Sequence, residues 1–169
     1  GGYGPSTGSG EPWGVLFSPL TTTQQAAAQS ALQQWSNVAA INFLASQDDA
    51  SVVGDIRFAW TDNNMSGEAA HAWIPFGSPK GGDIWLNASS SSFGSVVSGS
   101  YGYFALMHEI GHALGLKHPF EAEASSPSTL SDNDDVIHNT IMSYSAYPGG
   151  TGVSWNFMPT TPMRLDIKA

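Results

Sequence analysis

Three histidines and a glutamate lie close together in the stretch Ala105–Pro119, which reads ALMHEIGHALGLKHP. His108 and His112 are four residues apart, so a helix would present both imidazoles on one face, one turn above the other. This spacing allows both side chains to bind one metal ion, and it places Glu109 beside a water on that ion. A His-Glu-x-x-His sequence on a helix is typical of a zinc site whose glutamate is the general base of a metalloprotease.

The residues after this helix predict a third ligand. Gly115 follows His112 by three residues, where a helix can end in a left-handed turn that glycine adopts without steric cost. Such a turn reverses the chain and allows His118 to approach the same ion. Three protein ligands leave one position of a tetrahedral zinc open to water, as in catalytic sites. The chain has no cysteine, so the histidines must bind any transition metal and disulfides are excluded.

Two motifs in the same order carry a family resemblance. The zinc-site residues complete the longer pattern HExxHxxGxxH, which ends at His118, and IMSY follows at Ile141–Tyr144 as the methionine turn of the metzincin pattern. With Tyr101–Tyr103 ahead of them, these motifs resemble the catalytic domain of serralysin-type metzincins, the secreted bacterial zinc proteases. Weaker similarity reaches both ends of the chain, at Leu20–Phe43, Asp55–Trp60, Gly82–Asn87 and Thr161–Met163.

The resemblance implies a zincin-like α+β fold. It has a twisted mixed sheet with an antiparallel edge strand, two long helices and a loop-rich C-terminal lobe. The 169 residues suit a single domain with a substantial core. We expect a flexible Gly/Ser-rich stretch at 1–10, an N-terminal lobe at 11–115 and a C-terminal lobe at 116–169. No internal repeat interrupts this division.

Hydrophobic periodicity predicts the individual elements. A helix is expected over Gln24–Asn37, capped by a hydroxyl of Thr21–Thr23. A second helix from about Gly102 to Leu114 is apolar around most of its circumference, so it should be buried, and its polar groups then need a metal to satisfy them. A short last helix is expected to start at Thr161-Pro162. Strands are expected at Trp13–Phe17, Ile41–Leu44, Asp55–Trp60, Ala70–Phe76 and Asp83–Asn87.

The hypothesis for the chemistry is peptide hydrolysis. One zinc ion lowers the pKa of a bound water, and Glu109 takes the proton as that water attacks a peptide carbonyl. The resemblance implies Tyr144 as an additional zinc ligand that moves to the oxyanion during turnover; a core or surface tyrosine is the alternative. It implies Met142 as an apolar floor under the histidines, and a primed-side pocket beside Ser145–Pro148. It also implies an edge strand that binds extended substrate, formed by Ala70, His71, Ala72, Trp73 and Ile74.

Several polar groups have plainer interpretations. His71 and His138 are more often surface or hydrogen-bonded histidines than ligands. Asp132–Asp135 offers oxygen ligands for calcium but lacks the spacing of a recognisable calcium loop, so a solvated acidic loop is favoured. The Ser-rich segment Ala88–Ser100 is expected to be a solvated connector. Pro119–Glu121 lacks the glycine that many serralysins have there, which is expected to reshape the rim of the cleft.

Composition limits the partners. A net charge of −9 with five Lys and Arg residues gives no electrostatic basis for binding nucleic acid or an anionic membrane. The chain opens without a signal peptide and shows no glycine-rich calcium-binding repeat, which suggests a mature or excised catalytic part, or a relative without that tail. The resemblance implies secretion from a bacterium, protein or peptide substrates and a monomer, and it leaves room for a protein inhibitor.

Two rival functions remain open. The chain could be a binding module that keeps zinc and no longer cleaves, although the intact Glu109 argues against loss of catalysis. It could also hydrolyse amides other than peptides. The edge strand distinguishes hydrolysis of peptides from hydrolysis of other amides, because only a peptide backbone can pair with it fully.

Overall fold

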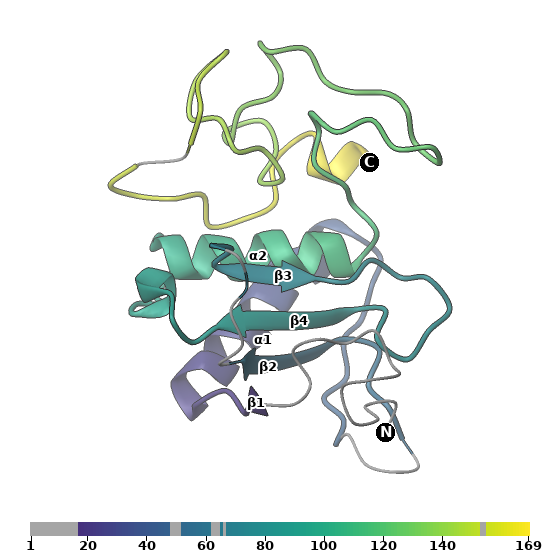
Figure 1. Cartoon of the computed structure of the whole chain (residues 1–169), viewed down its shortest axis with the longest axis vertical. Helices are drawn as coiled ribbons and strands as arrows, with labels where there is room; N and C mark the ends of the chain where they lie inside the picture. The colour runs from purple at the N-terminus through teal and green to yellow at the C-terminus, as the bar shows by residue number, and fades with distance from the viewer. Residues whose placement is uncertain (1–16, 48–51, 62–64, 66, 153–154) are drawn as a thin grey trace.

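A four-stranded mixed sheet forms one layer of the fold (Figure 1). The structure is a computed structural model that describes residues 17–47, 52–61, 65, 67–152 and 155–169. The two central strands are parallel to each other, and each edge strand is antiparallel to its neighbour. The mixed sheet with an antiparallel edge strand is therefore confirmed. In sheet order the strands are β1 (Phe17–Ser18), β2 (Arg57–Thr61), β4 (Asp83–Asn87) and β3 (Ala70–Ala72).

Helix α1 (Thr22–Val38) forms where a helix was predicted. Thr21 caps it with a capping box, in which Gln24 N donates to Thr21 Oγ1 and Thr21 N donates to Gln24 Oε1 at 2.9 Å. The buried face of α1 includes Trp35, whose indole Nε1 donates to the Met107 carbonyl at 3.1 Å. This bond fixes α1 against the helix that carries the histidines.

Helix α2 (Tyr101–Ala113) is buried along nearly its whole length, as its apolar circumference predicts. The Ser-rich segment before it is not simply a solvated connector. It contains a short 3-10 helix, η1 (Ser91–Phe93), and Phe93 and Val96 are only 5% and 9% exposed. The two apolar side chains anchor the segment, and the Phe93 ring packs edge-on against Trp60 with 5.6 Å between ring centroids.

Three predicted strands differ from the structure. Ile41–Leu44 is not a strand: Leu44 is 89% exposed, and the segment pairs with no strand of the described sheet. β3 ends at Ala72 rather than Phe76, because Pro75 has no N–H for a ladder bond and the chain turns at Gly77. β2 begins at Arg57, two residues late. Of the predicted first strand, residues 13–16 lie outside the described residues.

The chain after Gly115 runs beyond the β3 edge of the sheet, on the far side of α2 (Figure 1). Its one described helix is the 3-10 turn η2 (Asp166–Lys168), so the helix expected at Thr161-Pro162 is wrong. The Asp166 carboxylate accepts a bond from Met163 N at 2.6 Å, which takes a backbone donor out of helical pairing. The division into two lobes at 115 stays a prediction.

Gly82 is required by close backbone packing between the residues just ahead of β2 and those just ahead of β4. Its φ is +89°, and a Cβ there would lie 2.0 Å from the Asp55 carbonyl oxygen. We expect Gly82→Ala to cost at least about 2 kcal/mol, seen as a melting-temperature loss of roughly 4–8 °C. Gly77→Ala is the matched control, because Gly77 has a φ of +69° but open space around it. Equal losses in the two variants would contradict the close-contact argument.

Candidate metal centre

The end of α2 returns the chain toward the histidines. Gly115 has a φ of +101°, as its position predicts. Gly115 N donates to the His112 carbonyl at 2.8 Å and Leu116 N donates to the Gly111 carbonyl at 2.9 Å, which together form a Schellman motif. The reversal brings His118 back beside the helical face that carries His108 and His112.

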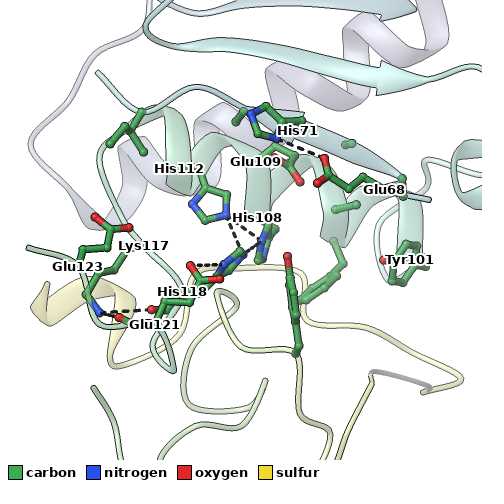
Figure 2. Close-up of a pocket in the computed structure, with 17 residues that line it drawn as sticks. Glu68, His71, Tyr101, His108, Glu109, His112, Lys117, His118, Glu121 and Glu123 are labelled. Carbon is green, nitrogen blue, oxygen red and sulfur yellow. Dashed lines mark hydrogen bonds and ion pairs between the residues drawn. The ribbon is translucent and has the colours of Figure 1, made fainter. Parts of the chain in front are cut away.

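The three imidazoles converge through their Nε2 atoms (Figure 2). His108 Nε2 lies 3.1 Å from His112 Nε2 and 3.3 Å from His118 Nε2, and His112 Nε2 lies 3.0 Å from His118 Nε2. His108 Nδ1 donates to the Ile141 carbonyl at 2.8 Å, and His112 Nδ1 donates to the Leu116 carbonyl at 2.7 Å. A carbonyl only accepts, so these two Nδ1 atoms carry the protons and both Nε2 lone pairs face the centre.

This arrangement fits zinc. Nitrogens bound tetrahedrally at about 2.0–2.1 Å lie about 3.3 Å from one another, close to the distances found. Histidines that bind metal usually donate their other N–H to a carbonyl or carboxylate, as His108 and His112 do. His118 Nδ1 lies 3.0 Å from Glu121 Oε2, within ion-pair distance although outside hydrogen-bond alignment. Three lone pairs facing one point repel each other unless a cation lies between them.

Burial keeps the His108 and His112 imidazoles neutral. Burial, with the neighbouring His112, lowers the pKa of His108 to about 3, and burial lowers the pKa of His112 to about 4. Neutral imidazole is the form that binds metal. Glu109 is 8% exposed beside them, and burial together with the charge of Glu68 raises its pKa to about 8. A carboxylate with a raised pKa is suited to accept a proton near neutral pH.

These shifts predict how the stability of the metal-free chain depends on pH. Folded Glu109 binds its proton more tightly than the unfolded chain, so its stabilising contribution is complete below about pH 4.5 and is lost as pH rises toward 8. Folded His108 binds its proton less tightly than the unfolded chain, because its pKa is lowered. Its stabilising contribution is therefore lost as pH falls from about 6.5 toward 3. Between pH 6.5 and 8 the Glu109 effect acts without the His108 effect.

We therefore expect metal-free Glu109→Gln to lose less stability than the metal-free wild type between pH 6.5 and 8. Thermal unfolding in a metal chelator at both pH values measures this difference. Identical pH dependence in the two proteins would show that Glu109 does not titrate in this range.

The methionine turn lies directly beneath the histidine helix. Met142 is 2% exposed, and a Cβ added to Gly111 would lie 2.5 Å from the Met142 sulfur. Gly111 therefore gives Met142 the room to pack against α2. Asp166 holds this turn through three contacts to its carboxylate: Thr140 Oγ1 donates at 2.5 Å, Ile141 N at 3.0 Å and Met163 N at 2.6 Å.

Two aromatic rings flank His118. Phe120 stacks on its imidazole with ring centroids 5.0 Å apart and 7° between planes, and the Tyr144 ring lies 4.5 Å away at 56°. Tyr144 is 49% exposed, and its ring also stacks at 5.5 Å on His108. Burial of its hydroxyl, and next the charge of Glu109, raise the pKa of Tyr144 and keep the phenol protonated. Tyr144 is thus placed beside two of the imidazoles.

Lys117 ties down the loop that follows the third histidine. Its ammonium donates to the carbonyls of His118 at 3.4 Å and Ser128 at 2.9 Å, and to the Glu121 carbonyl. Leu130 N also donates to the Pro119 carbonyl at 2.9 Å. The loop that carries Phe120 and Glu121 is therefore closed at its base, and the Phe120 ring and the Glu121 carboxylate beside His118 are held with it.

A cavity of about 500 Å³ opens over the imidazoles. Ala70, His71, Ala72 and Ile74 line one side of it, so the edge strand β3 borders the metal centre. Trp73 does not line the cavity; it packs against the rings of His71 and Phe76 and lies under the Lys80 ammonium. The remaining lining residues come from Glu68 and Ala69 ahead of β3, from α2, from the segment 117–123 and from Tyr144, and not from Ser145–Pro148.

The other polar candidates lie outside the three-histidine group. His71 Nδ1 lies 3.3 Å from Glu68 Oε2, and His138 stacks parallel to Trp155 at 6.3 Å. In the acidic segment, Asp134 accepts from Ser131 Oγ at 3.0 Å and pairs with Arg164 Nη2 at 3.4 Å. These contacts agree with the plainer interpretations of these residues.

Sequence reasoning missed Asp166, Lys117 and Phe120. Asp166 acts 25 residues away from Ile141, and no local spacing marks such a pair. Phe120 occupies a position noted only as lacking glycine. Lys117 was visible as the residue next to His118, but a lysine donating to three carbonyls has no sequence signature.

Comparison with known proteins agrees with this geometry. A family model described as Matrixin matches residues 18–137. A serralysin from Photorhabdus laumondii is 34% identical over 142 residues, 79% of this chain and 29% of the relative. Serralysin B from Dickeya chrysanthemi is 32% identical over 174 residues, 97% of this chain and 35% of the relative. A metalloprotease from Pseudomonas entomophila, AprA, is 35% identical over 137 residues, 76% of this chain and 27% of the relative.

The fold, the three-histidine centre and these matches define the class of protein. The chain belongs to the matrixin family, as a metzincin catalytic domain of the serralysin type. It spans about a third of the length of these relatives.

Proposed function

We propose that the chain is a zinc-dependent endopeptidase that hydrolyses extended protein substrates. The observation that carries this proposal is the convergence of three histidine Nε2 atoms beside the buried carboxylate of Glu109, in a cavity bordered by an edge strand. His108, His112 and His118 hold the ion in this proposal. The bound zinc supplies Lewis acidity and a water of lowered pKa.

The residues of the chain carry the remaining steps. Glu109 takes the proton of the attacking water and passes it to the leaving amine, a transfer for which a raised pKa is favourable. Tyr144, with its phenol kept protonated, donates a hydrogen bond to the oxyanion and is an additional metal ligand at rest. Met142 packs under the histidine helix and keeps its position fixed.

The substrate backbone pairs with β3 in this proposal. β3 is hydrogen-bonded to β4 on one side, and within the described sheet it is the terminal strand. Ala70 and Ala72 have small side chains, which leaves room for a peptide along the edge. Main-chain pairing gives affinity with little dependence on sequence, as a peptidase for unfolded proteins needs.

The test is hydrolysis of an unfolded protein by the zinc-loaded chain, with Glu109→Gln as the matched variant. We expect the variant to lose about 10²–10⁴-fold in kcat while it still binds one zinc, because only the base is removed. Bound metal is measured on the same samples. Equal cleavage by both proteins would exclude Glu109 as the base.

A zinc-binding module without catalysis is the main rival. It predicts that the wild type binds one zinc and cleaves neither proteins nor peptides. A hydrolase of other amides would cleave small amides as well as extended peptides. The closeness of Glu109 to the imidazoles favours catalysis, since a module that only binds zinc has no use for a buried base.

The localisation, oligomeric state and regulation of the protein are proposed from its family membership. Secretion from a bacterium, a monomeric state, control by a protein inhibitor and two lobes of one domain meeting at the cavity are all part of the proposal. No helix among the described residues is long and apolar enough to cross a membrane. Size-exclusion chromatography and limited proteolysis at residues 114–118 test the monomer and the lobes.

A further inference from the structure

Acidic side chains stand on both sides of the metal centre. Figure 2 shows Glu68 on one side of the imidazoles and Glu121 and Glu123 on the other. Glu68 lies two residues ahead of β3, and the other two lie in the loop after His118. All three line the same cavity as the edge strand and the imidazoles. A peptide along β3 would therefore pass a carboxylate at each end of the cavity.

Basic side chains do not balance this charge. Of the charged residues that line the cavity, four are glutamates, including Glu109, and one is a lysine. That lysine, Lys117, directs its donors to the backbone carbonyls of Glu121 and Ser128 and not to the carboxylates. The cavity thus presents a negative field in a chain whose net charge is already −9.

The carboxylates also remain accessible to a ligand. The Glu68 and Glu121 side chains are 53% and 50% exposed, and their described partners are the histidines His71 and His118. Neither histidine satisfies both oxygens of its glutamate. Glu123 is partly buried and lines the same cavity. An ammonium or guanidinium group of a bound peptide can therefore pair with these oxygens without displacing an internal salt bridge to Lys or Arg.

We propose that the cavity selects cationic peptide segments, with Lys or Arg on both sides of the cleaved bond. The proposal rests on the proposed peptidase function and on the placement of the substrate along β3. Lysine or arginine near Glu68 at one end, and near Glu121 or Glu123 at the other, gains an opposite charge, whereas a glutamate there meets a like charge. The general negative field also speeds the approach of cationic chains, and salt weakens both effects.

The experiment compares three internally quenched peptides of equal length that differ only in the residues flanking the cleaved bond: Lys, Gln or Glu. With the zinc-loaded wild type at low salt, we expect kcat/KM to fall in that order, by about tenfold from Lys to Glu, since each partly exposed pair contributes modestly. The preference should shrink at 0.5 M salt, where the Debye length is only about 4 Å.

Variants assign the preference to named side chains. Glu68→Gln with Glu123→Gln should reduce the Lys-to-Glu ratio of kcat/KM about threefold or more. The ratio is taken within each protein, so a change in the overall rate through the effect of Glu68 on the pKa of Glu109 cancels. Glu121 is left intact because it contacts His118. Asp132→Asn is the control, because it removes an exposed charge outside the cavity.

The outcomes separate this proposal from the one it rests on. Equal rates for the three peptides would overturn the charge selectivity and leave the peptidase intact. An unchanged Lys preference in the double variant would overturn its assignment to the cavity rim. No cleavage of any of the three peptides by the zinc-loaded wild type would overturn the peptidase function and, with it, the charge selectivity.

Discussion

Replacing His112 by alanine is expected to lower zinc affinity by more than about 100-fold. Loss of an outer-shell partner alone costs about 10–100-fold in metal affinity, and this change removes a ligand atom that lies 3.0–3.1 Å from the other two. The remaining pair, His108 and His118, cannot surround the ion. Peptide hydrolysis should disappear with the metal. Competition with a chromogenic chelator measures the affinity directly.

His138→Ala provides the matched control. His138 is exposed, stacks on Trp155 and lies outside the three-histidine group, so its variant should bind zinc as the wild type does. Zinc should also raise the melting temperature of the control and not that of His112→Ala, because only a ligand that binds the folded state adds stability. Wild-type affinity in His112→Ala would refute the three-histidine centre.

Asp166→Ala is expected to destabilise the fold by about 3–5 kcal/mol. The change leaves the donors of Thr140, Ile141 and Met163 without their shared acceptor, at about 1–3 kcal/mol for each buried group that water cannot reach. For a chain of this size the melting temperature should fall by roughly 10 °C. Thermal unfolding in excess chelator isolates this effect from metal binding.

The same variant should also weaken zinc binding. Ile141 receives a bond from His108 Nδ1 on its carbonyl and donates its own N–H to Asp166, so the carboxylate fixes the orientation of the first ligand through one residue. Asp132→Ala is the control for loss of a negative charge, since Asp132 is exposed. A melting temperature equal to that of the control would show that the methionine turn does not need Asp166 for its stability.

The sequence predicted the metal ligands better than the residues that hold those ligands in place. His108, His112, Gly115 and His118 act within a single helix end, where fixed helical geometry converts spacing directly into position. The capping box at Thr21 and the strand Asp83–Asn87 were likewise readable, because hydroxyl capping and apolar runs are local signals.

Long-range contacts explain what was missed. Ile41–Leu44 has the composition of a strand, but a strand forms only where a partner is available, and that depends on the whole fold. The sequence did not reveal the role of Asp166, because Thr140 and Ile141, which its carboxylate binds, lie about 25 residues away. Phe93 and Val96 anchor a Ser-rich segment whose composition alone suggested full exposure.

The bonds from Lys117 to the backbone carbonyls of the loop after His118 affect whether the proposed peptidase digests itself. A protease at high concentration meets the exposed loops of its neighbours, and it cleaves those that can straighten along a sheet edge. The loop after His118 is polar and largely exposed, yet one ammonium group holds the carbonyls of Glu121 and Ser128 together. A loop held in this way cannot be drawn out without breaking those bonds, so we expect self-digestion to spare the segment that carries the third histidine.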